Sequence, residues 1–189
     1  VLKLSFLNLI MLNIKSELLN QEKMSNIISR ISFEIFEKFD SFEDVAIVGI
    51  KTRGEILAQR IVDKLYSDSK VKVDLGILNV TFYRDDFSSN LGSPKIGPSD
   101  ISFDVNNKNI ILVDDVLYTG RTIRAAMNEI FTFGRPHSIK LAVMVDRGHR
   151  QIPIKPDFIG KSYPTAGDEH VHVLVQEIDD EDKVILVEY

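Results

Sequence analysis

A pair of adjacent carboxylates stands just before a run of residue types that bind phosphate. Asp114 and Asp115 end an apolar run, and residues 119–122 (Thr-Gly-Arg-Thr) come at the start of a stretch with helical periodicity. Backbone N–H groups at the start of a helix lack partners and the helix dipole is positive there, so they bind phosphate. Carboxylates accept hydrogen bonds from sugar hydroxyls or bind a hydrated Mg²⁺. The segment therefore predicts a site with a phosphate end and a sugar end.

The same residue types also occur in two structures that bind no sugar phosphate. An ordinary turn with a helix cap is one, since Asp, Thr and Gly all favour such positions. A receiver-like phosphoacceptor domain is the second, but its acidic pair would not need the Thr-Gly-Arg-Thr run. The sequence contains neither G-x-x-x-x-G-K-[ST] nor G-x-G-x-x-G, so a Walker P-loop and a dinucleotide fingerprint are excluded.

Alternating strands and helices must position these residues. The predicted strands are 45–50, 73–83, 109–115 and 138–146. The predicted helices are 17–39, 54–66 and 122–131. Such alternation implies right-handed crossovers, and we expect an α/β fold with a mostly parallel, twisted sheet flanked by helices. Ligands bind at the carboxyl ends of the strands in such sheets.

Two regions depart from this alternation. Residues 84–109 are rich in Ser, Gly, Pro and Asn, and their length favours a mobile lid. Near the C-terminus, the acidic run 179–182 separates two apolar runs and predicts a solvated hairpin turn. His170 and His172 share a face of the first run, a geometry that can bind zinc. We expect exposed or hydrogen-bonded histidines there, because the sequence offers no evident third ligand.

The composition excludes several classes of site. The chain has 189 residues, no Cys and a formal net charge of -5. Without cysteine, disulfide scaffolds, thiolate nucleophiles and Cys-ligated metal sites are excluded, and a reducing, cytoplasmic location is expected. The net charge argues against a globally basic nucleic-acid binder but leaves local basic patches open.

The N-terminal segment is predicted to lie outside the functional unit. Residues 1–14 are mostly apolar but shorter than the ~20 residues that span a bilayer, and no signal-peptide cleavage site follows, so we expect no membrane association. Met11 is a candidate natural start. We therefore treat residues 1–16 as an extension that need not be native, and residues 17–189 as a single domain.

Several motifs together resemble a known family. The run LVDDVLYTGRT resembles the 5-phosphoribosyl-1-diphosphate (PRPP) signature of type I phosphoribosyltransferases. GIKTRG (49–54), TFYRDD (81–86) and VDRGHRQIPIKPDFIGK (145–161) narrow the resemblance to the PyrR family, whose members are pyrimidine-operon regulators and uracil phosphoribosyltransferases. The resemblance covers residues 17–189. It implies the type I phosphoribosyltransferase fold, with a small hood and a flexible lid loop.

The resemblance also implies roles for individual residues. The acidic pair Asp114 and Asp115 would bind the ribose hydroxyls and, through PRPP, Mg²⁺. The implied PRPP-binding residues are Val116, Leu117, Tyr118, Thr119, Gly120, Arg121 and Thr122. The implied pyrophosphate-binding residues are Lys51, Thr52, Arg53, Gly54 and Arg84. Asp146 and Arg147 would bind uracil.

The implied reaction converts uracil and PRPP to UMP and pyrophosphate, and homodimers or larger oligomers are usual in the family. The second implied function is binding of pyrimidine-operon mRNA. Its candidate residues are His149, Arg150, Lys155 and Lys161. Relatives often carry Thr and His on the RNA side of the first helix, where this chain has Ser29 and Phe33. Two alternatives stay open: an RNA-binding regulator that uses the PRPP site only as a nucleotide sensor, and a purine phosphoribosyltransferase.

Overall fold

A five-stranded parallel sheet forms the centre of the protein. The computed structural model describes residues 13–80 and 98–188. The strand order is β3-β2-β4-β5-β6, and every neighbouring pair is parallel. The strands are β2 (Val45–Ile50), β3 (Asp74–Leu78), β4 (Asn109–Leu117), β5 (Ser138–Asp146) and β6 (Phe158–Ser162). The predicted α/β fold with a mostly parallel sheet is therefore confirmed.

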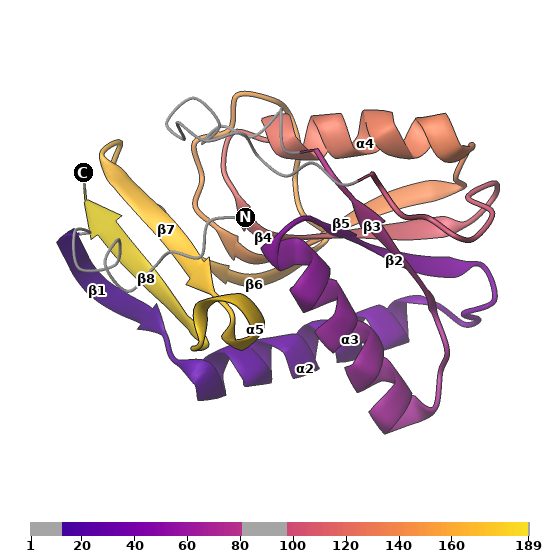
Figure 1. Cartoon of the computed structure of the whole chain (residues 1–189), viewed down its shortest axis with the longest axis horizontal. Coiled ribbons are helices and arrows are strands. Elements are labelled where there is room, and N and C mark those ends of the chain that lie inside the picture. The colour runs from indigo at the N-terminus through magenta and orange to yellow at the C-terminus, as the bar shows by residue number, and fades with distance from the viewer. Residues whose placement is uncertain (1–12, 81–97, 189) are drawn as a thin grey trace.

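Helices cover both faces of this sheet, as Figure 1 shows. On one face lie α2 (Gln21–Lys38) and α3 (Arg53–Ser69), and on the other lies α4 (Arg121–Phe133). Ile111 and Val113 of β4 belong to the core under α2 and α3, whereas Ile110 and Leu112 belong to the core under α4. Because β4 is buried on both faces, its sequence is a continuous apolar run rather than an alternating one.

A second, smaller sheet forms the hood. It is antiparallel, with the order β1-β8-β7. Its elements are β1 (Asn13–Leu19), β7 (Glu169–Leu174), the short helix α5 (Gln176–Asp179) and β8 (Lys183–Glu188). β7 contacts β4, and the hydroxyl of Tyr163 donates to the carbonyl of Leu18 at 3.1 Å. The hood thus stands beside the central sheet, at the left of Figure 1.

Several element boundaries differ from the sequence prediction. The predicted helix 17–39 begins only at Gln21, because Leu18 and Leu19 belong to β1 and Asn20 caps α2 by accepting from the Lys23 N–H. β4 continues to Leu117, two residues beyond the predicted end. Residues 13–16, which the sequence analysis places in an extension, lie in β1, while the division of the chain at residue 17 stays a prediction.

The segment predicted as a lid is described only in part. Within residues 98–108, Val105 is fully buried, and the N–H groups of Ile77 and Asp100 each donate to the other residue's carbonyl, which joins this part of the segment to β3. Its role as a lid stays a prediction. The rest of the predicted lid lies outside the described residues. The strand predicted at 73–83 is shorter than expected, because β3 ends at Leu78 and residues 79–80 are not in a strand, while residues 81–83 lie outside the described residues.

The acidic run 179–182 lies in the connection between the paired strands β7 and β8, as the predicted hairpin requires, but it is solvated only in part. Asp179 ends α5, and its side chain is only 1% exposed because it is paired with Arg53. Asp182 pairs with Arg60, also on α3. The predicted solvation is wrong for Asp179 and Asp182, because the arginines that neutralise them lie more than a hundred residues away in the sequence.

Candidate active site

The two predicted carboxylates lie near the carboxyl end of the central strand β4. Asp114 is 4% exposed and Asp115 is 9% exposed. Oδ1 of Asp114 accepts from the N–H of Asp115 at 3.0 Å, and Oδ1 of Asp115 accepts from the N–H of Val116 at 2.8 Å. These bonds to neighbouring N–H groups fix the orientation of both carboxylates, so a ligand would meet acceptors that are already in place.

The α4 loop (residues 118–122) joins β4 to α4. Gly120 has a φ of 94°, a conformation that other residues rarely adopt, and it is the N-cap of α4. Its carbonyl accepts from the N–H of Arg124 at 2.9 Å, while the N–H of Arg121 donates to Oγ1 of Thr119 at 3.2 Å. The positive end of the α4 dipole therefore follows the two carboxylates directly, as a phosphate site requires.

The segment after β5 holds the α4 loop from the other side. The carbonyl of Thr119 accepts from the N–H groups of Gln151 and Ile152 at 3.0 and 3.2 Å. The guanidinium of Arg121 donates to Oε1 of Gln151 at 3.0 and 2.8 Å. Gln151 could not be found from the sequence, because a glutamine in a loop forms no recognisable pattern by itself.

The α3 loop (residues 51–54) joins β2 to α3 and reaches the same edge of the sheet. The N–H of Lys51 donates to the carbonyl of Leu78 at 2.8 Å. The peptide bond between Lys51 and Thr52 is cis. A Cβ at Gly54 would lie 2.5 Å from the carbonyl oxygen of Val113 and 3.1 Å from Cα of Asp114. Glycine is therefore required where α3 begins, and it brings this loop directly against the carboxylate strand.

Arg53, predicted to bind pyrophosphate, has a partner within the protein. Its guanidinium donates through Nε and Nη2 to the two carboxylate oxygens of Asp179 at 3.1 and 2.8 Å. The side chain of Arg53 is 18% exposed. The bonds to Asp179 link the α3 loop to the hood.

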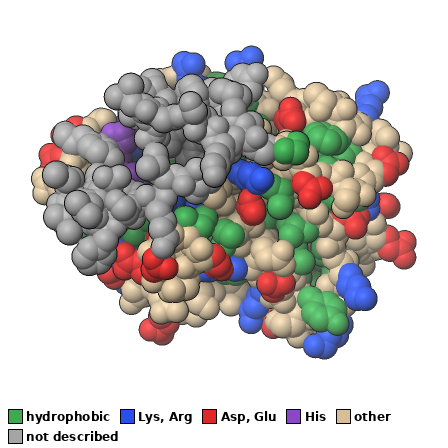
Figure 2. All heavy atoms as spheres, in the orientation of Figure 1, with side chains coloured by type: hydrophobic (Ala, Val, Ile, Leu, Met, Phe, Trp, Pro, Cys, Tyr) green, Lys and Arg blue, Asp and Glu red, His purple; other side chains and the backbone are tan. Residues whose placement is uncertain are grey.

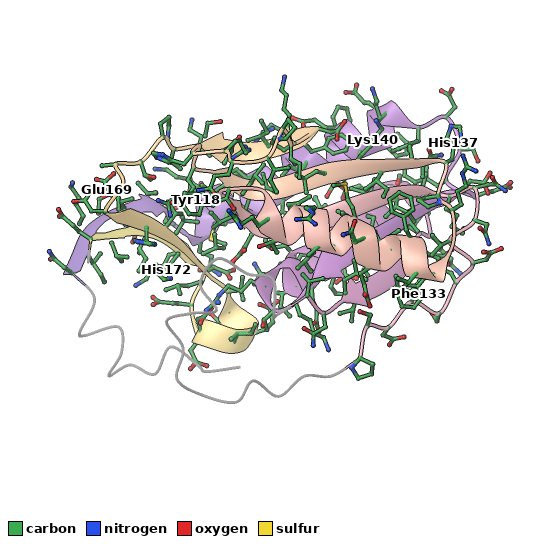
Figure 3. The ribbon with its side chains drawn as sticks, turned by 90° about the horizontal axis from the view of Figure 1, so that it is seen from above. Tyr118, Phe133, His137, Lys140, Glu169 and His172 are labelled. Atoms are coloured by element: carbon green, nitrogen blue, oxygen red, sulfur yellow. The ribbon has the colours of Figure 1, made fainter. Side chains whose placement is uncertain are left out.

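Arg147, predicted to bind the base together with Asp146, is buried where β5 ends. Its guanidinium lies 4.0 Å from the centre of the Tyr118 ring, and Nε donates to Oγ1 of Thr165 at 3.1 Å. Nη2 donates to the carbonyl of Glu169 on the hood. Burial lowers the pKa of Arg147 from its usual value, but an arginine stays charged at neutral pH. In Figure 3, Tyr118 lies toward the hood strand that carries Glu169 and His172, far from Phe133 and His137.

The predicted basic patch at residues 147–161 is smaller than the sequence suggests. Besides the buried Arg147, Arg150 donates to the carbonyls of Tyr118 at 2.8 Å and Ile154 at 2.9 Å and forms an ion pair with Asp146. Lys155 and Lys161 are exposed.

His149 and Arg84 complete the set of predicted residues. Nε2 of His149 is 2.7 Å from the carbonyl oxygen of Thr165, and its ring meets that of Tyr118 edge to face. The remaining predicted pyrophosphate ligand, Arg84, lies outside the described residues, as does the TFYRDD motif that contains it.

The carboxylates of the site fit Mg²⁺ only when a substrate supplies further ligands. Within residues 13–80 and 98–188, no group of three or more His, Cys, Asp or Glu side chains could hold a metal ion. Mg²⁺ commonly binds one or two carboxylates together with substrate phosphates and water. Asp114 and Asp115 can supply that share, so the residues present fit a metal that arrives with a phosphorylated sugar.

One hollow on the outer surface lies away from these residues. A hollow lined by Phe36, Phe39 and Phe42 lies beside Val45, at the amino end of β2 and so at the opposite edge of the sheet. Figure 2 shows acidic and basic side chains mixed over the described part of one face.

Among the residues that the structure describes, none of the helices has the length and the apolar composition that a membrane span needs.

Taken together, the site has three parts at one edge of the sheet: two oriented carboxylates, a helix N-terminus with a positive-φ glycine, and a second loop packed against the carboxylate strand. Such an arrangement can bind a sugar through its hydroxyls, one phosphate at α4 and a second phosphate group at the α3 loop.

Comparisons with known proteins agree with this geometry. Residues 15–179 match the model of the phosphoribosyl transferase domain. The chain is 48% identical over 170 residues to the Bifunctional protein PyrR of Caldicellulosiruptor bescii, covering 90% of this chain and 93% of that one. It is 49% identical over 165 residues to the Bifunctional protein PyrR of Ligilactobacillus salivarius, covering 86% and 93%.

Solved structures agree at the level of the fold. A hypoxanthine phosphoribosyltransferase from Staphylococcus aureus superposes with a TM-score of 0.70 at 17% identity, covering 97% of each chain. A hypoxanthine-guanine phosphoribosyltransferase from Bacillus anthracis gives 0.69 at 18% identity, covering 93% of this chain and 99% of that one. The resemblance seen in the sequence motifs is thus confirmed, and the chain belongs to the phosphoribosyltransferase family and, within it, to the PyrR proteins.

Proposed function

We propose that the protein is a uracil phosphoribosyltransferase that also regulates the expression of pyrimidine operons. The observation that carries the enzymatic part is the meeting of Asp114 and Asp115 with two loops, residues 51–54 and 118–122, at one edge of the sheet. Membership of the PyrR proteins, whose name describes them as bifunctional, supports both parts.

In this proposal each loop binds one end of PRPP. The 5-phosphate lies at the N-terminus of α4, where backbone N–H groups and the hydroxyls of Thr119 and Thr122 are donors. The ribose hydroxyls donate to the carboxylates of Asp114 and Asp115. The diphosphate lies against residues 51–54, and Arg84 is a further proposed ligand for it. Mg²⁺ bound through PRPP would neutralise charge on the departing pyrophosphate.

The proposed reaction needs no covalent bond between the protein and the substrate. As the bond from ribose to pyrophosphate lengthens, positive charge develops on the sugar ring, and buried carboxylates close to the ribose stabilise that charge. Uracil would bind on the side of the ribose opposite the pyrophosphate, next to Asp146 and Arg147. Because Arg147 is held by Tyr118, Thr165 and the carbonyl of Glu169, its place beside the base is fixed before substrate binds.

The test of the enzymatic part is UMP formation by the purified protein with Mg²⁺, PRPP and uracil. Hypoxanthine, guanine and orotate are tested in parallel as acceptors. Asp114→Asn and Asp115→Asn should each lower kcat/KM by roughly 100-fold, because one charged partner of the ribose is lost in the transition state. The proposal fails if the protein makes no UMP. Preferential use of a purine would support the purine phosphoribosyltransferase instead.

For the regulatory part we propose binding of pyrimidine-operon mRNA, strengthened by uridine nucleotides. Lys155 and Lys161 are the exposed cations of the candidate set. The guanidinium of Arg150 donates to backbone carbonyls of the α4 loop and of Ile154. On α2, Phe33 has a side chain that is 60% exposed but cannot donate a hydrogen bond to RNA. Binding of a leader hairpin should weaken as salt is raised, because each lysine that neutralises a phosphate releases counterions. Tight hairpin binding without any turnover would favour a regulator that uses the PRPP site only as a sensor.

We also propose a cytoplasmic protein with one domain over residues 17–189, in a homodimer or larger oligomer. The family membership supports this proposal. Sedimentation equilibrium of the purified protein measures the oligomer size, and a monomer at all concentrations would contradict it.

A further inference from the structure

Two arginines in one row on α3 are each held by an aspartate from the segment around α5. Arg53 donates to both oxygens of Asp179, at 3.1 and 2.8 Å. Arg60 donates to both oxygens of Asp182, at 3.0 and 2.8 Å, and to Glu177. Residues seven apart lie on nearly the same face of a helix, so the two pairs together dock the hood on α3. Figure 2 shows acidic side chains gathered in the region where Figure 1 places α5.

The two aspartates are matched in their remaining contacts. Asp179 also accepts from the N–H of Val175 at 2.9 Å, and Asp182 accepts from the N–H of Gln176 at 2.8 Å. Each therefore binds a backbone N–H at the start of α5 and one arginine of α3. Substituting either aspartate loosens the same junction between hood and helix. Only Asp179, however, reaches an arginine that belongs to the α3 loop.

Arg53 is placed so that its restraint is passed to the substrate site. It precedes Gly54, whose Cα packs against the backbone of Val113 and Asp114. Both bonds to Asp179 use the edge formed by Nε and Nη2. Among the described residues no acceptor meets Nη1, so its two N–H groups remain for an anion.

We propose that Asp179 is a positioning residue for the diphosphate of PRPP. By fixing the guanidinium of Arg53, it holds residues 51–54 against the end of β4 and leaves Nη1 to bind the diphosphate. This inference rests on the proposed transferase function and extends it, because it makes the hood part of the diphosphate subsite. The second pair, Arg60 with Asp182, has only the docking role.

The experiment compares Asp179→Asn with its matched control Asp182→Asn in the full chain. Binding of PRPP in the presence of Mg²⁺ is measured by titration calorimetry, and KM is measured for PRPP and for uracil. Asp179→Asn should raise the Kd and KM of PRPP about tenfold, because a small misplacement of a binding group is costly, and leave KM for uracil unchanged. Asp182→Asn should lower the melting temperature but leave PRPP binding unchanged.

A second pair of variants tests whether the effect passes through Arg53. Arg53→Lys keeps the charge but loses the two-pronged contact, so it should weaken PRPP binding as Asp179→Asn does. The double variant should bind no worse than Arg53→Lys alone, because Asp179 acts only through Arg53. Hydrogen exchange of residues 49–57 should be faster in Asp179→Asn than in Asp182→Asn.

Three results would overturn the inference: equal PRPP affinity in Asp179→Asn and Asp182→Asn, additive losses in the double variant, or normal PRPP affinity in Arg53→Lys. If Asp179→Asn does not fold, Asp179→Glu takes its place, because the longer carboxylate keeps the charge but displaces the guanidinium of Arg53. A wild-type protein that binds PRPP but makes no UMP would refute the proposed function, while the PRPP affinities would still decide the role of Asp179.

Discussion

The α4 loop and the α3 loop both follow a parallel strand and both reach the carboxylates, yet different bonds hold them. The α4 loop is held by the segment just after β5: the carbonyl of Thr119 accepts from two N–H groups of that segment, and the carbonyl of Tyr118 accepts from Arg150. The α3 loop has one backbone bond, from Lys51 to Leu78, and is otherwise held by a close glycine contact and by an ion pair that crosses to the hood. A loop held by one neighbouring segment depends on that segment alone, whereas one held through the hood depends on a separate sheet.

The largest effect should come from the glycine contact of the α3 loop. Gly54→Ala places a methyl group 2.5 Å from the carbonyl oxygen of Val113, and a backbone atom cannot move aside cheaply. We expect a loss of about 3 kcal/mol in the free energy of unfolding, measured by urea denaturation, and severely reduced UMP formation. A variant with wild-type stability would mean that this close contact is not a constraint.

A smaller but still large effect should come from the arginine beneath the α4 loop. Arg150→Ala leaves the carbonyls of Tyr118 and Ile154 without their donor and Asp146 without its ion pair. The free energy of unfolding should fall by about 2 kcal/mol, since partly buried acceptors lose their partners. Lys155→Ala is the control, because this lysine is exposed and its substitution should leave stability unchanged. Equal stability of the two variants would contradict the structural role of Arg150.

Removing a side chain that only touches the α4 loop should matter less. Gln151→Ala loses the contact with Arg121, but the N–H of residue 151 still donates to the carbonyl of Thr119. We therefore expect KM for PRPP to rise by no more than about threefold, since exposed pairs contribute little. A tenfold rise would show that the exposed contact between Gln151 and Arg121 also holds the α4 loop for PRPP binding.

The smallest effect should be a pH dependence in the hood. Burial, and then the charge of Arg147, lower the pKa of His170 below its usual value. The unfolded chain takes up this proton more readily, so the stabilising contribution is complete above about pH 6.5 and declines as the pH falls toward the lower folded-state pKa. His170→Gln should reduce the drop in melting temperature between pH 7 and pH 5 by about 2 °C or less, measured by calorimetry. An unchanged profile would show that His170 does not contribute.

The sequence predicts the local arrangement of the α4 loop better than the long-range contacts of the α3 loop. Asp114, Asp115 and Gly120 lie within a few positions of one another, and their spacing after an apolar strand predicts where the structure places them. The partnership of Arg53 with Asp179 could not be predicted, because no local pattern joins residues 126 positions apart. The burial of Arg147 escaped prediction for a similar reason: Tyr118, Thr165 and Glu169 come from three separate segments.

The hood has one further consequence, for the order in which the chain folds during synthesis. β1 pairs along its length with β8, so the strand Asn13–Leu19 has no partner until the strand Lys183–Glu188 has left the ribosome. The parallel sheet, by contrast, is complete once β6 has emerged. Because domains fold as their segments become available, the nascent chain would carry an assembled sheet while β1 still waits as an unpaired edge. The ion pair between Arg53 and Asp179 cannot form until residue 179 has emerged, so a nascent chain that reaches β6 but not α5 would have the carboxylates in place before the hood can hold the α3 loop.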